Sequence, residues 1–226
     1  MRLLFAVLLA YIPSPGSLLK HAAERARSLR SREVTLTGTL AATGEPLRNA
    51  QLVLRFPFQC RLEGDGGLSL SVKGTPQNPE GVAEGTTGPA LRLLQLACPL
   101  LAYRGVPSAD AAQALKIAAL AAGADVSLGG GLSRFDDRVT YVLGAGSREP
   151  SVPQLWLYKD NYAPARLVAQ GGADLRLLEY GNPAAGEWFP RVIELWSSGQ
   201  LAARFETLES KGVRGVAREE EDDSRE

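Results

Sequence analysis

The sequence predicts a mainly β protein of the α+β class, in which about ten short strands form one antiparallel sheet. From Glu33 to Leu40, apolar residues alternate with threonines at the period of two that is typical of a half-buried strand. From Val152 to Trp196, four apolar runs are separated by residues that favour tight turns. The first strands follow one another with no helix between them, which excludes a parallel βαβ arrangement.

The composition is that of an ordinary globular domain. The chain has 226 residues, 45% of them hydrophobic, which is enough for one domain with a sizeable core. Its formal net charge of +0 argues against a nucleic-acid surface, where an excess of basic residues is expected. An acidic run between Glu219 and Glu226 is typical of a solvated tail. We therefore expect residues 218–226 to be disordered and residues 18–217 to form the domain.

The N-terminal segment has the features of a secretory signal peptide. Met1-Arg2 is followed by an uncharged apolar run from Leu3 to Ile12 and then by Pro13-Ser14-Pro15-Gly16-Ser17. An apolar core this short is typical of a cleaved signal and not of a stable bilayer anchor. We assign residues 1–17 to a signal peptide and expect an exported protein. The alternative is a buried N-terminal helix of a cytosolic protein.

The first half of the domain should contain one helix and three or four strands. An amphipathic helix is expected to be capped by Ser17 and to end near Leu29. A loop rich in Gly, Pro, Thr and Asn follows the strands, with Val82–Glu84 as a short edge strand. The strands are expected at residues 34–40, 51–56 and 68–73, with 57–63 as the uncertain fourth.

Two helices are expected between the halves of the sheet. Apolar residues surround the segment Pro89–Tyr103 almost completely, and a helix that is apolar on every side is expected to be buried on every side. Pro99 should kink or end this helix. The second helix should run from Ser108 to Ala122 and end at Gly123.

The second half should be an antiparallel meander with tight turns at Asp136-Asp137, Asp160-Asn161 and Gly171-Gly172. The glycines Gly129–Gly131 favour a bend or bulge. Residues 211–217 should add a ragged edge. The expected strands are residues 125–128, 132–135, 138–143, 154–159, 165–169, 175–180, 191–196 and 201–208.

The sequence offers little for catalysis or metal binding. Its one histidine, His21, has no partner with which to build a Ser-His-Asp or Cys-His arrangement, and we expect it at the surface. The pair Asp136-Asp137 is interpreted as a turn and not as an acid-base pair. Two separated cysteines and one histidine fall short of a structural zinc site. We therefore expect no enzyme, no metal and no cofactor.

Cys60 and Cys98 are the two cysteines of the chain, and both lie in apolar surroundings. In an oxidising compartment the pair can close and would stabilise the fold by about 3–4 kcal/mol. Two buried free thiols are the alternative, because the sequence does not fix the distance between the two residues.

The expected sheet encloses more space than its own side chains fill. About eight strands already suffice for a barrel that is filled by side chains. The apolar helix Pro89–Tyr103 is the natural plug for a wider, curved sheet. If the helix moves, the same interior takes an acyl chain, to which each buried methylene contributes about 0.8 kcal/mol. The alternative is that the helix is simply core and needs no ligand.

Both halves of the chain carry an ordered set of short motifs. In the first half, a Thr-rich strand precedes Leu52-x-Leu54-Arg55-x-Pro57 and Arg61-x-Glu63. In the second half, an aromatic strand leads to Lys159-Asp160, Pro164-x-Arg166-Leu167, Tyr180-Gly181 and Trp188-Phe189-Pro190-Arg191. This order, which covers most of residues 18–215, resembles the LolA-like family of periplasmic lipoprotein carriers and related lipid-binding proteins.

The resemblance implies an unclosed antiparallel β-barrel, or half-barrel, with an N-terminal helix and a helical lid over an apolar cavity. It also implies a monomeric periplasmic carrier or chaperone for an acylated lipoprotein or a lipid, with an inner-membrane transporter as donor and an outer-membrane acceptor. The alternative within the same fold is a non-enzymatic structural or envelope-stress sensor domain with a packed interior.

The resemblance also points to individual residues. In the carriers an arginine directly before the proline helps to hold the lid shut, whereas this chain has Phe56 there and Arg55 one residue earlier. Arg55 and Arg61 are therefore the candidates for a lid latch. The residues expected to line the cavity and lid are Leu36, Leu52, Leu54, Leu93, Leu96, Leu100, Trp156 and Leu195.

Overall fold

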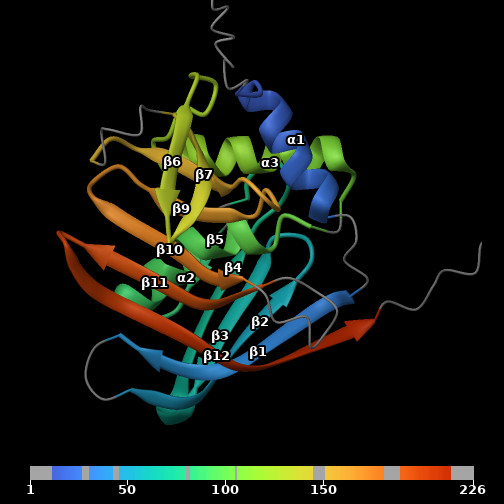
Figure 1. Ribbon diagram of the computed structural model, residues 1–226. Helices are drawn as coiled ribbons and strands as arrows, with labels where there is room; N and C mark the ends of the chain where they lie inside the picture. The colour runs from blue at the N-terminus through green and yellow to red at the C-terminus, as the bar shows by residue number, and fades with distance from the viewer. Residues whose placement is uncertain are drawn as a thin grey trace, which may run out of the picture.

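The computed structural model describes residues 12–26, 31–42, 46–79, 82–104, 106–144, 151–180 and 189–214. Within these ranges the protein has twelve strands in a single sheet and three α-helices (Figure 1). The expectation of a mainly β protein with one unclosed antiparallel sheet is confirmed, with twelve strands in place of about ten.

The helices and strands alternate along the chain in two blocks of strands, separated by two of the helices. The helices are α1 (Pro15–Ala26), α2 (Pro89–Leu101) and α3 (Ser108–Ala121). The first block of strands is β1 (Ser31–Ala41), β2 (Leu47–Arg55), β3 (Gln59–Gly64), β4 (Leu68–Lys73) and β5 (Val82–Glu84). The second block is β6 (Gly131–Phe135), β7 (Arg138–Leu143), β8 (Gln154–Tyr158), β9 (Pro164–Val168), β10 (Ala173–Tyr180), β11 (Pro190–Ser197) and β12 (Gln200–Arg214).

The sheet is two meanders joined by the first and last strands. Its order is β5-β4-β3-β2-β1-β12-β11-β10-β9-β8-β7-β6, and β1 and β12 pair antiparallel along most of β1. The edge strands β5 and β6 are not paired with each other, so the barrel is open. The predicted short edge strand Val82–Glu84 is therefore confirmed as β5.

Turn residues explain why the strands of the second block stay short. Asp136 and Asp137 both have positive φ, as do Gly171 and Gly172. Two successive residues of this kind give a loop whose twist matches that of the flanking strands. Asp136-Asp137 joins β6 to β7, and Gly171-Gly172 joins β9 to β10, as predicted.

Several element boundaries differ from the expectation. Ser17 is not the cap of α1, because the Ser17 N–H donates to Oγ of Ser14 at 3.3 Å and the helix begins at Pro15. Residues 125–128 form a turn and not a strand, since the N–H and hydroxyl of Ser127 both bond Oδ1 of Asp125. Pro99 does not end α2, which runs on to Leu101.

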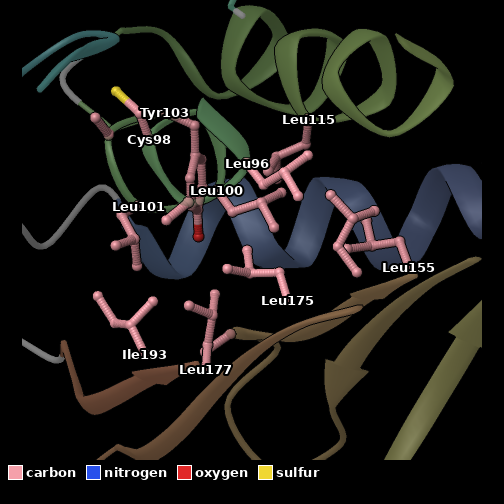
Figure 2. Packing of buried hydrophobic residues seen from close by; sticks show 14 of the residues in the cluster. Leu96, Cys98, Leu100, Leu101, Tyr103, Leu115, Leu155, Leu175, Leu177 and Ile193 are labelled. Atoms are coloured by element: carbon pink, nitrogen blue, oxygen red, sulfur yellow. The ribbon is translucent and has the colours of Figure 1, made fainter. Parts of the chain in front are cut away.

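The core lies between the concave face of the sheet and the helices. In α2, nine of the thirteen residues are buried, and the helix contacts β3, β4, β9, β10, β11, β12 and α3. Leu96, Leu100 and Leu101 of α2 face Leu175, Leu177 and Ile193 of β10 and β11 (Figure 2). The helix α1 packs on α3 through its apolar face, at one end of the half-barrel (Figure 1).

Two of the predicted segments lie mostly outside the described residues. Residues 1–11 of the expected signal peptide and the whole acidic tail 218–226 belong to this part of the chain. Of the helices that the structure does describe, none has the length and apolar composition needed to cross a membrane.

The glycine run before β6 generates a test of how closely the backbones approach. A Cβ added at Gly130 would lie 1.4 Å from the carbonyl oxygen of Val142, whereas at Gly129 it would meet nothing within 4 Å. We expect Gly130→Ala to destabilise the protein by about 1–3 kcal/mol, because β7 must shift to admit the methyl group. Gly129→Ala should change stability by less than about 0.5 kcal/mol. Urea unfolding measures both, and equal midpoints for the two variants would contradict the close approach.

Candidate functional site

The concave interior is the candidate ligand site, and most of the residues predicted to line it meet there. Seven of the eight are inward-facing members of one apolar cluster: three from β1 and β2, three from α2 and one from β11. None of the seven is more than 4% exposed. They are Leu36, Leu52, Leu54, Leu93, Leu96, Leu100 and Leu195.

The eighth predicted residue, Trp156, is buried but lies on the other face of the sheet. Its neighbours Leu155 and Leu157 point to the interior, and successive residues of a strand point to opposite faces. On the outer face the Trp156 ring lies 5.1 Å from the Arg166 guanidinium and 5.9 Å from the Phe135 ring. Trp156 thus belongs to the same buried cluster as the seven leucines, but its ring packs against Arg166 and Phe135.

Trp156 begins a ladder of charged and aromatic side chains across β8 to β12. Arg166 donates to both carboxylate oxygens of Asp174, at 2.7 and 2.9 Å, and Arg176 also bonds Asp174. The Arg176 guanidinium lies 4.3 Å from the ring of Trp196. Charged groups can be partly buried here because each one has an opposite charge or an aromatic face beside it.

The ladder continues to the last strand. The indole N–H of Trp196 donates to Glu194 at 2.8 Å, and Arg204 donates to the other Glu194 oxygen at 2.6 Å. The outer face of these strands is thus occupied by polar groups that bond one another. The apolar face that remains for a ligand is the inner one, which α2 now covers.

A disulfide fixes the C-terminal part of α2 to the sheet. The Cys60 and Cys98 sulfurs are 2.02 Å apart, and their Cα atoms are 5.8 Å apart. Of the two alternatives that the sequence left open, the structure contains the bridge. Beyond it, the Phe58 N–H donates to the carbonyl oxygen of Ala102 at 2.7 Å.

Aromatic residues hold the segment that follows α2. The Tyr103 hydroxyl donates to the carbonyl oxygen of Ala22 at 3.4 Å, and the Arg104 guanidinium lies 4.7 Å from the Phe189 ring. Phe189 also stacks on Phe56, the residue that stands before the proline of the family motif. Sequence analysis missed these contacts, although the run Phe56-Pro57-Phe58 next to Cys60 was a signal for them.

The N-terminal part of α2 is held by packing alone. From Gly88 to Gln95, no hydrogen bond, ion pair or disulfide within the described chain joins the helix to the sheet. Gly85 and Gly88 before the helix both have positive φ, and Val82 of the adjoining edge strand is exposed. The two ends of α2 therefore differ sharply in how firmly they are held.

The two arginines predicted to latch the lid face away from it. Arg55 is exposed and pairs with Glu33, and Arg61 is exposed and pairs with Glu63 at 3.3 Å. Their strand neighbours Leu54 and Cys60 point inward, so both arginines lie on the outer face. The latch prediction is wrong for both residues, and the Cys60–Cys98 bridge holds α2 instead.

Three buried tyrosines carry polar groups near these elements: Tyr103 after α2, Tyr158 in β8 and Tyr180 in β10. Burial raises the pKa of Tyr103, Tyr158 and Tyr180, so all three hydroxyls stay neutral at physiological pH. The Tyr158 hydroxyl donates to the carbonyl oxygen of Leu177 at 3.2 Å. Among the described residues, no group of three His, Cys, Asp or Glu side chains is arranged to hold a metal ion.

Three of the pockets on the described part of the protein have lining residues outside α2. Their volumes are about 390, 300 and 120 Å³. The largest lies where β11 begins beside β12, and it includes Leu36 from the predicted cavity set. In this state the apolar interior is filled by the side chains of α2.

An open antiparallel half-barrel with an apolar helix on its concave side is the fold implied by the LolA-like motifs, so that expectation of fold is confirmed. Similar solved structures include a LolA superfamily protein from Nitrosomonas europaea, with 18% identity, coverage of 91% of this chain and 96% of that one, and a TM-score of 0.46. A DUF1329 family protein from Desulfovibrio piger has 11% identity, the same coverages and a TM-score of 0.50.

A third structure, described as an outer membrane lipoprotein-sorting protein domain from Vibrio parahaemolyticus, has 11% identity, coverages of 91% and 96%, and a TM-score of 0.42. No protein-family model matches the sequence, and no curated protein does. Identities this low describe a shared fold and leave the function of this chain open.

The disulfide should contribute strongly to stability. Replacing Cys60 and Cys98 together by alanine frees two residues 38 positions apart and should lower the free energy of unfolding by about 3–4 kcal/mol. Guanidinium unfolding of the variant and of the oxidised protein measures the difference. Reductant should destabilise the natural chain and leave the double variant unchanged; equal midpoints for the variant and the oxidised natural chain would contradict the prediction.

The outer ladder should depend on Asp174. The side chains of Arg166 and Asp174 are only 14% and 13% exposed, so Asp174→Ala leaves a partly buried guanidinium without its carboxylate. We expect a loss of about 2–4 kcal/mol, near the lower end of the range for a broken buried pair. Glu84→Ala, which breaks the exposed pair with Lys73, should cost less than about 1 kcal/mol. Thermal unfolding compares the two variants, and similar melting temperatures would show that the ladder is not a stabilising feature.

Proposed function

We propose that the chain is an exported carrier that takes the acyl chains of a lipoprotein or a lipid into the concave interior now filled by α2. The observation that carries the proposal is that one helix, apolar on nearly every side, covers the inner face of the sheet through side-chain packing. An unbranched hydrocarbon chain offers the same inner face an equivalent apolar surface. The LolA-like fold supports this proposal.

Opening would proceed by a swing of α2 about its C-terminal end. The Cys60–Cys98 bridge and the Phe58–Ala102 hydrogen bond hold that end, whereas residues 88–95 contact the described part of the sheet through packing alone. The glycines at positions 85 and 88 allow the connection from β5 to change direction. The bridge keeps the helix attached to β3 while its other end leaves the interior.

The free energy gained by burying an acyl chain is similar in size to the free energy lost when the start of α2 leaves the interior. A buried methylene contributes about 0.8 kcal/mol, so one long acyl chain offers on the order of 10 kcal/mol. In exchange, leucines near the N-terminal end of α2, among them Leu91, Leu93 and Leu94, give up part of their burial. The closed form therefore prevails without ligand, and an acyl chain shifts the population towards the open form.

This function places the chain in the periplasm, between an inner-membrane donor of acylated protein and an outer-membrane acceptor. Such a carrier needs no catalytic group, and the interior supplies apolar contact as its binding chemistry. It needs no cofactor, metal ion or nucleic acid.

A non-enzymatic structural or envelope-stress sensor domain is the second candidate. The observation that favours it is the filled interior, in which the seven inward-facing leucines are all buried and α2 lines none of the three pockets. In that case α2 is permanent core, and no lipid replaces it.

Binding of an acylated probe distinguishes the two candidates. We expect a fluorescein-labelled peptide with two palmitoyl chains to bind the purified protein in anisotropy titrations, and the same peptide without acyl chains to remain free. When the peptide binds, the rate of hydrogen exchange should increase more in residues 88–95, at the start of α2, than in residues 96–103, because the end with the disulfide stays in place.

The native host provides an independent check. Protein purified from it should carry lipid that extraction and mass spectrometry detect. No bound lipid together with no binding of the palmitoylated peptide would reject the carrier and favour the packed domain.

A further inference from the structure

The last strand extends beyond one of its two neighbours. β12 pairs with β11 only from Gln200 to Glu206, while its pairing with β1 continues to Arg214. Within the described part of the chain, no strand pairs with the other side of residues 207–214, although Pro190 and Arg191 at the start of β11 line a pocket together with Thr207–Ser210. In Figure 1 the red end of β12 runs on beside the blue start of β1.

This free edge is accessible and partly apolar. The pocket of about 390 Å³ borders it, with Thr207, Leu208, Glu209 and Ser210 among its lining residues. Leu208 is 70% exposed and Val213 is 51% exposed. Unpaired backbone groups beside exposed apolar side chains form a template on which another strand can add.

The charges on the edge are arranged so that they complement themselves. Glu209 and Lys211 flank Ser210, are both exposed, and lie on the same face of the strand, opposite Thr37 and Thr35 of β1. If two such edges pair antiparallel about a two-fold axis at Ser210, each Glu209 lies opposite the partner's Lys211. The dimer therefore contains two such Glu209–Lys211 pairs, because a two-fold axis repeats every contact between the two copies.

The same charges disfavour the neighbouring pairing registers, in which one strand is shifted by two residues along the other. A shift of two residues in one direction places Glu209 opposite the partner's Glu209, and a shift in the other direction places Lys211 opposite the partner's Lys211. Like charges directly opposite each other destabilise a pair of strands, whereas opposite charges stabilise it. The charge pattern therefore selects the register centred on Ser210.

We propose that the free edge of β12 is an interface between two copies of this chain, which pair antiparallel through residues 207–213 about an axis at Ser210. A second copy is the occupant that the edge itself specifies, because the edge is complementary to its own two-fold image. The pairing gives the unpaired backbone groups of both copies partners and brings Leu208 of each copy next to the other chain. This proposal replaces the expectation of a monomer and does not depend on lipid binding.

Charge reversal tests the interface and its register. Sedimentation equilibrium of the purified protein at low salt should show a dimer. Lys211→Glu and Glu209→Lys should each weaken the dimer by about tenfold or more, because two attractive pairs become two repulsive ones. The double variant Glu209→Lys/Lys211→Glu should restore it. Lys73→Glu, which reverses an exposed lysine on β4, is the control and should leave the dimer intact.

Disulfide cross-linking at Ser210 provides a second test of the interface. Ser210→Cys should form a disulfide between two copies on oxidation, since Ser210 lies opposite the partner's Ser210, and Ser69→Cys on the exposed face of β4 should not. A natural chain that sediments as a monomer would overturn the proposal, even if the edge then binds a peptide from another protein. So would a dimer that neither single charge reversal weakens.

Discussion

The structure depends on covering one apolar surface. Twelve strands curve into an open barrel whose inner face is almost entirely aliphatic, and such a face must be removed from water. α2 does this with nine buried residues, and α1 and α3 cover one end. The disulfide that attaches α2 to β3 and the apolar composition of α2 both serve to keep this surface covered. The candidate function uses the same surface.

The outer face of the second block of strands carries a partly buried layer of charged and aromatic side chains. There no helix of the described residues lies over the sheet, yet Trp156, Arg166 and Asp174 are largely shielded from solvent. Bidentate ion pairs and stacked aromatic rings satisfy the charges, so the outer layer is ordered without being apolar. The outer face of the sheet is therefore polar and the inner face is apolar. Only the apolar inner face offers a surface suited to a lipid.

Local patterns in the sequence predicted most strands and turns. The alternation from Val34 to Leu40 and the turn pairs Asp136-Asp137 and Gly171-Gly172 depend on near neighbours alone. The apolar helix was also predictable, because its composition shows that it is buried. The face on which Trp156 lies was not, because it depends on a cross-strand partner, Arg166, that the strand's own composition does not reveal. The inward-facing leucines of the strands follow from alternation, and those of α2 follow from its apolar composition, whereas the direction of the two latch arginines was misjudged from a family motif.

The full length of β12 was also not predicted, because Gly212 is a poor strand former that only the pairing with β1 holds in the strand. This pairing joins the first strand of the domain to the last. During synthesis β1 has β2 on one side and an open position on the other until residues 200–214 emerge. Contacts between segments so distant in sequence form late and slow folding. Until β12 is in place, the exposed edge of β1 is open to aggregation. A chain without β12 would also lose the strand that joins the two halves of the sheet.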